Sequence, residues 1–154
     1  MSDERRVLIV EARYYEDIAD ELARGAIQVI EQAGIGHDRL PVPGVFEIPA
    51  AIRFALRSME THAVTTDYAG FVALGTVIRG ETDHHAHIAR EAVRALMDIA
   101  TDKAVVLGFG VLACDTEKQA RARAAVSGKN KGGEAARACL RMMELRKTLR
   151  LAQR

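Results

Sequence analysis

Three histidines, a threonine and two acidic residues lie close together near the middle of this 154-residue chain. Positions 75–85 read Gly-Thr-Val-Ile-Arg-Gly-Glu-Thr-Asp-His-His, and His87 follows. An apolar run at 71–74 precedes this stretch, and apolar residues at helical spacing run from Ile88 to Ile99 after it, so we expect a strand-to-helix turn. In an open parallel sheet such a turn lies at the carboxyl end of the strand, where ligands bind.

The turn at Gly80, Glu81 and Thr82 is a candidate anion site. The first N–H groups of a helix have no intrahelical partner and lie at the positive end of its dipole. A phosphate would be held there by backbone donors, and the Thr82 hydroxyl would add one more. The alternative is an ordinary helix start with acidic residues in its first turn.

Three interpretations compete for His84, His85 and His87. A histidine that titrates near neutral pH suits general acid–base catalysis on a bound substrate, and a neighbouring anion site favours that role. A zinc site would use His84 and His87, but no cysteine or further histidine completes it at a known spacing. Half-buried histidines without a special role are also common.

Further candidates occupy other turns between a strand and a helix. Glu47 would accept hydrogen bonds from a hydroxylated ligand, or would simply favour the start of a helix. Tyr14 and Tyr15 follow the first apolar run, where a ring would stack on a flat ligand or pack on the neighbouring turn. Phe109 has the same two interpretations, with a core role as the default.

Two basic residues near a glycine-rich break, Arg123 and Lys131, could reach an anion, although most such residues are only solvated. The two cysteines, Cys114 and Cys139, lack metal-ligand spacing and do not form a disulfide framework. Both are expected to be small buried residues.

These residues need a scaffold of alternating strands and helices. Apolar runs at 7–10, 71–74 and 104–112 predict buried strands, and 40–44 holds a short strand at most, where Pro41 indicates an edge position or the strand's end. Helices are expected from 18 to 33, from Pro49 to 59, from His84 to about Ala100, after Thr116 and from about Glu134 to Leu149, with a break over 128–133. This alternation predicts an α/β fold with a parallel sheet in one domain spanning 1–154.

Composition excludes several functional classes. A hydrophobic fraction of 49% is sufficient for a core, and the net charge of +1 with few aromatic residues argues against nucleic-acid binding. No apolar run has the length of a signal peptide core or a membrane span. We therefore expect a cytoplasmic protein without a membrane partner.

Four motifs together resemble those of the lumazine synthase family. They are Val-Pro-Gly-Val-Phe-Glu-Ile-Pro at 42–49, Gly-Thr-Val-Ile-Arg-Gly-Glu-Thr-Asp-His at 75–84, Phe-Gly-Val-Leu at 109–112 and Lys-Gly-Gly-Glu-Ala-Ala at 131–136. The resemblance implies a flavodoxin-like three-layer α/β/α sandwich with a four-stranded parallel sheet. It implies that 5-amino-6-(D-ribitylamino)pyrimidine-2,4-dione condenses with 3,4-dihydroxy-2-butanone 4-phosphate to give 6,7-dimethyl-8-ribityllumazine in riboflavin biosynthesis, without a metal or organic cofactor.

The resemblance also assigns roles by position. His84 matches the family's proton-transfer histidine, and the other matches are a phosphate site at Gly80, Glu81, Thr82 and Arg123, and a pyrimidine and ribityl site at Tyr14, Val45, Phe46, Glu47, Val77, Ile78, Phe109 and Lys131. Arg123, Phe109 and Lys131 match residues from an adjacent subunit. The resemblance thus implies a homo-oligomer, a pentamer or an icosahedral shell of sixty subunits, with active sites at subunit interfaces.

Some positions depart from the family pattern. Tyr14-Tyr15 replaces the usual Phe-Asn, His85-Ala86 replaces an aromatic residue followed by an aspartate, and Ala113 replaces a threonine. Two further hypotheses stay open: a flavin-binding or shell-forming protein of the same fold without turnover, and a metal-dependent phosphohydrolase.

Overall fold

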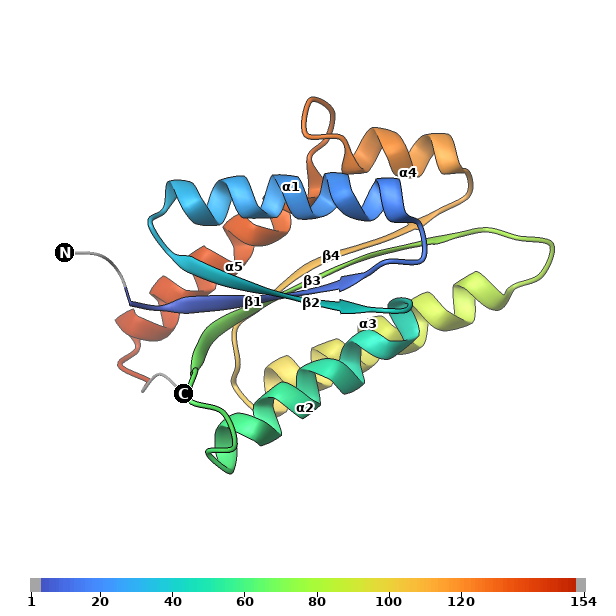
Figure 1. Ribbon diagram of the computed structural model, residues 1–154. Helices are drawn as coiled ribbons and strands as arrows, with labels where there is room; N and C mark the ends of the chain where they lie inside the picture. Colours follow the sequence, from blue (N-terminus) through green and yellow to red (C-terminus); the bar gives the residue numbers. More distant parts are fainter. Residues whose placement is uncertain (1–3, 152–154) are drawn as a thin grey trace.

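Apolar runs and amphipathic stripes alternate along the chain, and in the computed structural model, which describes residues 4–151, they form four strands and five α-helices (Figure 1). The elements are β1 (Arg6–Ala12), α1 (Glu16–Gln32), β2 (Gly36–Val42), the 3₁₀ helix η1 (Val45–Glu47), α2 (Ile48–Glu60), β3 (Tyr68–Ile78), α3 (His84–Asp102), β4 (Leu107–Cys114), α4 (Glu117–Ala124) and α5 (Lys131–Thr148). Residues 1–3 and 152–154 of the predicted domain lie outside the described residues.

All strand pairs are parallel, in the order β2-β1-β3-β4. The chain passes from β1 to β2 on one side and then returns to place β3 on the other side. The strand order therefore reverses between β1 and β3. In open α/β sheets, ligands bind outside the carboxyl ends of the strands at such a reversal point.

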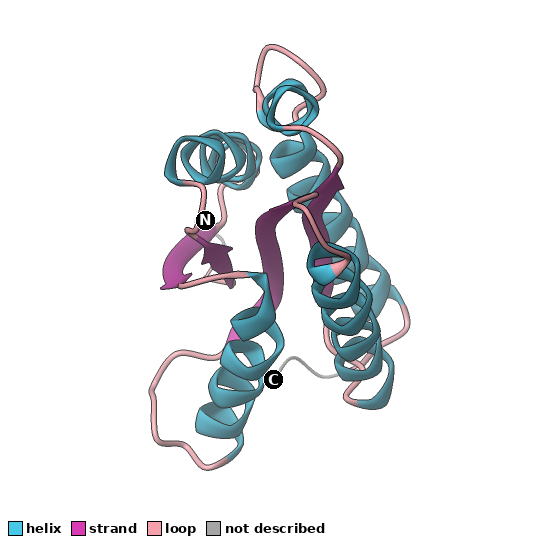
Figure 2. Cartoon of the chain, turned by 90° about the vertical axis from the view of Figure 1, so that its right-hand side faces the viewer, coloured by secondary structure: helices cyan, strands magenta, loops and turns pink. Residues whose placement is uncertain are grey.

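Helices cover both faces of the sheet, which confirms the predicted three-layer α/β/α sandwich. Helices α1, α4 and α5 lie on one face and α2 and α3 on the other, as the two orthogonal views show (Figures 1 and 2). Side chains alternate between the faces along each strand. Val7 and Ile9 therefore join the core under α1 and α5, whereas Leu8 and Val10 join the core over α2 and α3.

β1 and β3 part at the carboxyl edge of the sheet. Their pairing ends with Glu11 opposite Leu74, after which β1 stays with β2, and the Arg13 N–H donates to the Val42 carbonyl at 3.0 Å. β3 instead continues beside β4 as far as Ile78. Residues 76–78 of β3 thus have no neighbouring strand on the β1 side, and a slot opens between the two strands.

Strand lengths differ from the sequence-based expectations. β2 begins at Gly36, so the expectation of a short strand at 40–44 was wrong, although β2 is an edge strand as Pro41 indicated. The first residues of β2 are polar, and residues of other strands form hydrogen bonds with them: Asp38 accepts from Arg6 and from Tyr68. β3 also runs on to Ile78, which leaves only residues 79–83 as the turn before α3.

The expected break over 128–133 was too long. α5 begins at Lys131, because Asn130 takes a left-handed conformation (φ 48°) and its side chain accepts from the Gly133 N–H at 3.1 Å. Gly132 lies inside the first turn, where an added Cβ would be 2.0 Å from the Leu22 carbonyl oxygen. Glycine is therefore required for the contact between α5 and α1, not for a break. Among residues 4–151, no helix is both long and apolar enough to cross a membrane.

Candidate active site

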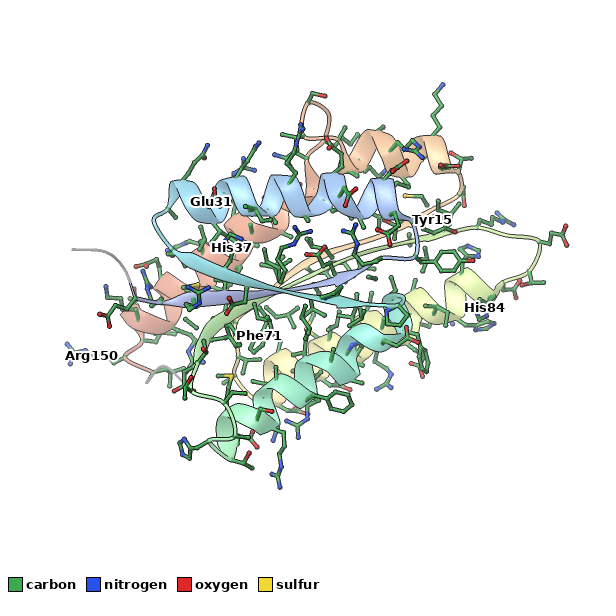
Figure 3. The ribbon with its side chains drawn as sticks, in the orientation of Figure 1. Tyr15, Glu31, His37, Phe71, His84 and Arg150 are labelled. Atoms are coloured by element: carbon green, nitrogen blue, oxygen red, sulfur yellow. The ribbon has the colours of Figure 1, made fainter. Side chains whose placement is uncertain are left out.

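A cavity of about 480 Å³ lies at the carboxyl edge of the sheet, over the slot between β1 and β3. Figure 3 shows Tyr15 at the start of α1 and His84 at the start of α3 at this same end, with His37 at the opposite end. Nine of the predicted site residues line the cavity: Tyr14, Val45, Phe46, Glu47, Val77, Ile78, Gly80, Thr82 and His84. One chain therefore brings together residues at the ends of three strands, β1, β2 and β3.

The turn before α3 forms one side of the cavity. The Thr82 hydroxyl accepts from the His84 N–H at 3.3 Å and still has its own hydrogen to donate. A Cβ added at Gly80 would meet no atom within 4 Å, so a ligand can approach the backbone at this position. The amino end of a 19-residue helix adds positive potential. This geometry suits an oxyanion such as phosphate.

The histidines of this turn differ in their surroundings. His84 and His87 are exposed, whereas His85 is half-buried. His84 and His85 line the cavity and His87 does not. His84 has no hydrogen-bonded side-chain partner among the described residues, so its imidazole is free to reach a bound substrate. An accessible imidazole beside an anion site is suited to proton transfer.

Two tyrosines at the end of β1 form the opposite wall. The Tyr14 ring is 76% exposed, and the Tyr15 ring packs against the core beneath α1. The ring centroids are 4.9 Å apart in an edge-to-face arrangement. Tyr15 thereby supports Tyr14, which presents its free face for stacking on a flat ligand. Burial raises the pKa of Tyr15, which keeps its phenol protonated.

The 3₁₀ helix η1 brings Val45, Phe46 and Glu47 to the cavity. The Glu47 carboxylate accepts the Gly44 N–H at 3.1 Å and fixes the start of η1 while it stays exposed. Val45 packs on β3 at Gly75, where a Cβ would lie 2.8 Å from Val45 Cγ2. The absence of a side chain at Gly75 therefore sets the distance between η1 and the slot.

The floor of the cavity is the free edge of β3. Val77 and Ile78 pair with Ala113 and Cys114 of β4, so the opposite edge of β3 faces the slot. Backbone N–H and C=O groups on such an edge form hydrogen bonds with a strand or a ligand. A planar heterocycle with donors and acceptors along one side fits this edge.

Four predicted site residues do not line this cavity. Glu81 is exposed in the turn, and Phe109 is exposed on β4. The Arg123 guanidinium donates to the Gln119 carbonyl at 3.2 Å, and Lys131 pairs with Glu134 at 2.9 Å. Within a single chain these four side chains are not part of the site.

The cavity also contains residues to which the family resemblance assigned no role; of these, Tyr15 and His85 were candidates from the sequence, whereas Gly44, Thr76 and Ile88 were not. Thr76 is only 7% exposed, and its hydroxyl has no partner among residues 4–151. The sequence signal that could have identified Thr76 is a polar residue inside an otherwise apolar strand. The additional lining residues are Tyr15, Gly44, Thr76, His85 and Ile88. Residues 4–151 contain no cluster of three or more His, Cys, Asp or Glu side chains arranged to hold a metal ion.

The chain is similar to known proteins over nearly its whole length. The family model for 6,7-dimethyl-8-ribityllumazine synthase matches residues 4–147. The chain belongs to this family. A synthase from Paramagnetospirillum magneticum is 47% identical over 147 residues, covering 96% of this chain and 98% of the relative. A synthase from Agrobacterium fabrum is 50% identical over 143 residues, covering 93% of this chain and 95% of the relative.

The match to the 6,7-dimethyl-8-ribityllumazine synthase family runs from β1 into α5. It therefore includes both cores and all the turns at the cavity. The match therefore concerns the whole described architecture and not one motif. The resemblance inferred from four short motifs is confirmed.

Proposed function

We propose that this chain is a 6,7-dimethyl-8-ribityllumazine synthase that condenses 5-amino-6-(D-ribitylamino)pyrimidine-2,4-dione with 3,4-dihydroxy-2-butanone 4-phosphate. The observation that carries this proposal is the cavity at the point where β1 and β3 part. It combines an anion cradle, an accessible histidine, an exposed aromatic ring and a free strand edge, which are the features that two such substrates require.

The two substrates occupy different walls. The phosphate of the butanone lies at Gly80 and Thr82, near the amino end of α3. The pyrimidine lies with its polar edge along 77–78 of β3 and its face on the Tyr14 ring. The ribityl chain extends to η1, where the Glu47 carboxylate accepts hydrogen bonds from its hydroxyl groups.

His84 transfers protons in this scheme. The pyrimidine amine attacks the butanone carbonyl, and loss of water gives an imine. Loss of the phosphate then gives an enol, which rearranges to a second carbonyl group. Attack of the ribitylamino nitrogen on this carbonyl closes the ring with loss of another water. Each step adds or removes a proton near the start of α3, and a positioned imidazole contributes about 10²–10⁴-fold to such steps. Holding two substrates together supplies several kcal/mol more.

A homo-oligomer completes the site in this proposal. Arg123, Phe109 and Lys131 lie outside the cavity of their own chain, which supports their serving the cavity of a neighbouring copy. A second groove runs between β2 and α2, and its exposed apolar side chains include Phe54, which is 72% exposed. Exposed apolar surface of this kind favours a subunit interface. Light scattering of the purified protein distinguishes a pentamer from a larger shell. A cytoplasmic location stays a prediction.

The test is a two-substrate assay. Mixing the protein with both substrates is expected to produce the absorbance of the lumazine and to release phosphate. His84→Ala is expected to slow this reaction by about 10²–10⁴-fold, whereas His87→Ala, on the same turn but outside the cavity, changes it little. A folded protein that forms no product contradicts the proposal. Tight binding of both substrates without turnover would instead favour a flavin-binding or lumazine-binding protein of the same fold.

A further inference from the structure

His85 is a second imidazole of the cavity, on the inward side of α3. It is one turn before Ile88 and two turns before Ala92, both of which pack on the core beneath this helix. His85 is half-buried and lines the cavity beside the exposed His84. Two adjacent histidines thus meet the same cavity in different environments.

The two ring nitrogens of His85 are not equivalent. Nδ1 is buried and has no hydrogen-bond partner among residues 4–151. Nε2 also forms no hydrogen bond with the described residues, but unlike Nδ1 it is not buried. The accessible edge of the ring is therefore the one that carries Nε2, and His85 is one of the residues that line the cavity.

This burial selects one tautomer. A neutral imidazole carries one N–H and one acceptor nitrogen. An N–H on the buried Nδ1 would be a donor without an acceptor, and orphaned buried N–H groups are rare because they are costly. A proton on Nε2 instead lies on the accessible edge of the ring, where water or a ligand can accept it. His85 is then oriented as a donor, not as a base.

We infer that His85 donates a hydrogen bond from Nε2 to an oxygen of the phosphate-bearing substrate, an inference that rests on the proposed function. His85 is in the first turn of α3, and the Gly80–Thr82 cradle is in the turn that leads into this helix, so the substrate held by the cradle is the one within reach. A donor at the positive end of a helix stabilises negative charge that develops on an oxygen when a carbonyl is attacked. His84 then moves protons while His85 holds the oxygen.

Three substitutions separate the two nitrogens. Glutamine carries its amide N–H at about the reach of Nε2, asparagine carries it at about the reach of Nδ1, and phenylalanine fills the space without either. We expect His85→Phe and His85→Asn to lower kcat/KM for the butanone phosphate by about 3- to 10-fold, as loss of one hydrogen bond does. His85→Gln is expected to stay within about 2-fold of wild type, and KM for the pyrimidine is expected to be unchanged in all three.

His87→Gln is the matched control, because His87 is on the same turn but outside the cavity. Urea unfolding of each variant separates a loss of fold from a loss of binding. The inference is overturned if glutamine, asparagine and phenylalanine have equal effects in folded protein, or if the loss falls on the pyrimidine alone.

A spectroscopic measurement tests the tautomer independently of activity. The chain has five histidines, so ¹⁵N-labelled imidazoles give a small set of signals, and the His85→Gln variant identifies the one that belongs to His85. Above neutral pH we expect ¹⁵N shifts typical of a protonated Nε2 and a bare Nδ1. The opposite tautomer overturns the inference even in an active enzyme. The expected tautomer in a protein that forms no lumazine would show that the proposed function had failed instead.

Discussion

A methyl group added at Gly75 tests how η1 is placed against the slot. In Gly75→Ala the new Cβ would lie 2.8 Å from Val45 Cγ2, 2.9 Å from the Ala12 Cβ and 3.4 Å from Ile48 Cδ1. Carbon atoms are in comfortable contact at about 3.5–4.0 Å. Two of the three distances are therefore too short by roughly 0.6–1.2 Å, and the Ala12 Cβ is fixed to the backbone of β1. Most of the movement must come from η1.

The magnitude follows from these contacts. Overpacking of a tight core costs about 1–3 kcal/mol, and replacing glycine in a strand returns roughly 0.5–1 kcal/mol. We expect a net loss of about 1–2 kcal/mol in the free energy of unfolding. A displacement of about 1 Å at a site can cost up to 10²-fold in rate. KM for the ribitylaminopyrimidine should rise most, because η1 holds the ribityl chain in the proposed site.

The assay combines urea unfolding with steady-state kinetics for each substrate. Gly80→Ala is the control for stability, because its new methyl group meets open space and should change stability by less than about 0.5 kcal/mol. A double-mutant cycle with Val45→Ala identifies the contact. The valine truncation should cost less stability in the Gly75→Ala background, since it also relieves the clash.

The reasoning is refuted if Gly75→Ala unfolds at the wild-type urea concentration and keeps wild-type KM values. Unchanged stability with altered kinetics would mean that the strand accommodates the methyl group and only the slot changes. Additive effects of the two substitutions would show that Val45 is not the residue that limits the space at Gly75.

Two further predictions concern one half-buried tyrosine and two buried cysteines. Burial and the hydrogen bond to Asp38 raise the pKa of Tyr68 to about 12, so its phenol stabilises the fold fully below about pH 10 and loses this effect as pH rises toward 12. Urea unfolding should show wild type more stable than Tyr68→Phe at pH 8, with a smaller difference at pH 11, and an equal difference at both values would contradict this. Burial also raises the pKa of Cys114, and that of Cys139 to about 12, so a thiol reagent at pH 8 should modify neither cysteine until the protein unfolds; modification of the native protein would contradict their burial.

The three-layer fold could be predicted because its signals are local. The apolar runs at 7–10 and 71–74 and the helical stripe after His84 follow from the periodicity of single elements. The start of β2 could not be predicted in this way. His37, Asp38 and Arg39 look like a loop, and their strand depends on partners from other elements, such as Arg6 beside Asp38.

The residues of the candidate site also form two groups, those that local sequence predicts and those that depend on distant segments. Gly80, Thr82 and His84 follow from helix-start chemistry within one turn, and the structure places all three at one cavity. Thr76 was missed, because its importance depends on β1 leaving β3 two residues earlier, which no local pattern records. Arg123 and Lys131 cannot be assigned within one chain, because their proposed partner is another copy. Local sequence patterns therefore do not predict features that depend on contacts between distant segments, and the roles of Arg123 and Lys131 came only from the family resemblance.

The slot itself has a physical cause in the side chains next to β1. Glu11 is only 2% exposed and accepts from Arg39 Nε at 2.6 Å and from Arg13 Nη1 at 2.8 Å. The bond from Arg39 joins the end of β1 to β2, and losing it would be strongly unfavourable because the carboxylate is buried. Beyond Glu11 and Leu74 the pairing of β1 with β3 ends, and the Thr76 hydroxyl has no partner among the described residues. Buried polar groups without partners cost stability, and a ligand that forms hydrogen bonds with them offsets that cost, so we expect a ligand of this cavity to pair with the Thr76 hydroxyl and the backbone edge of β3.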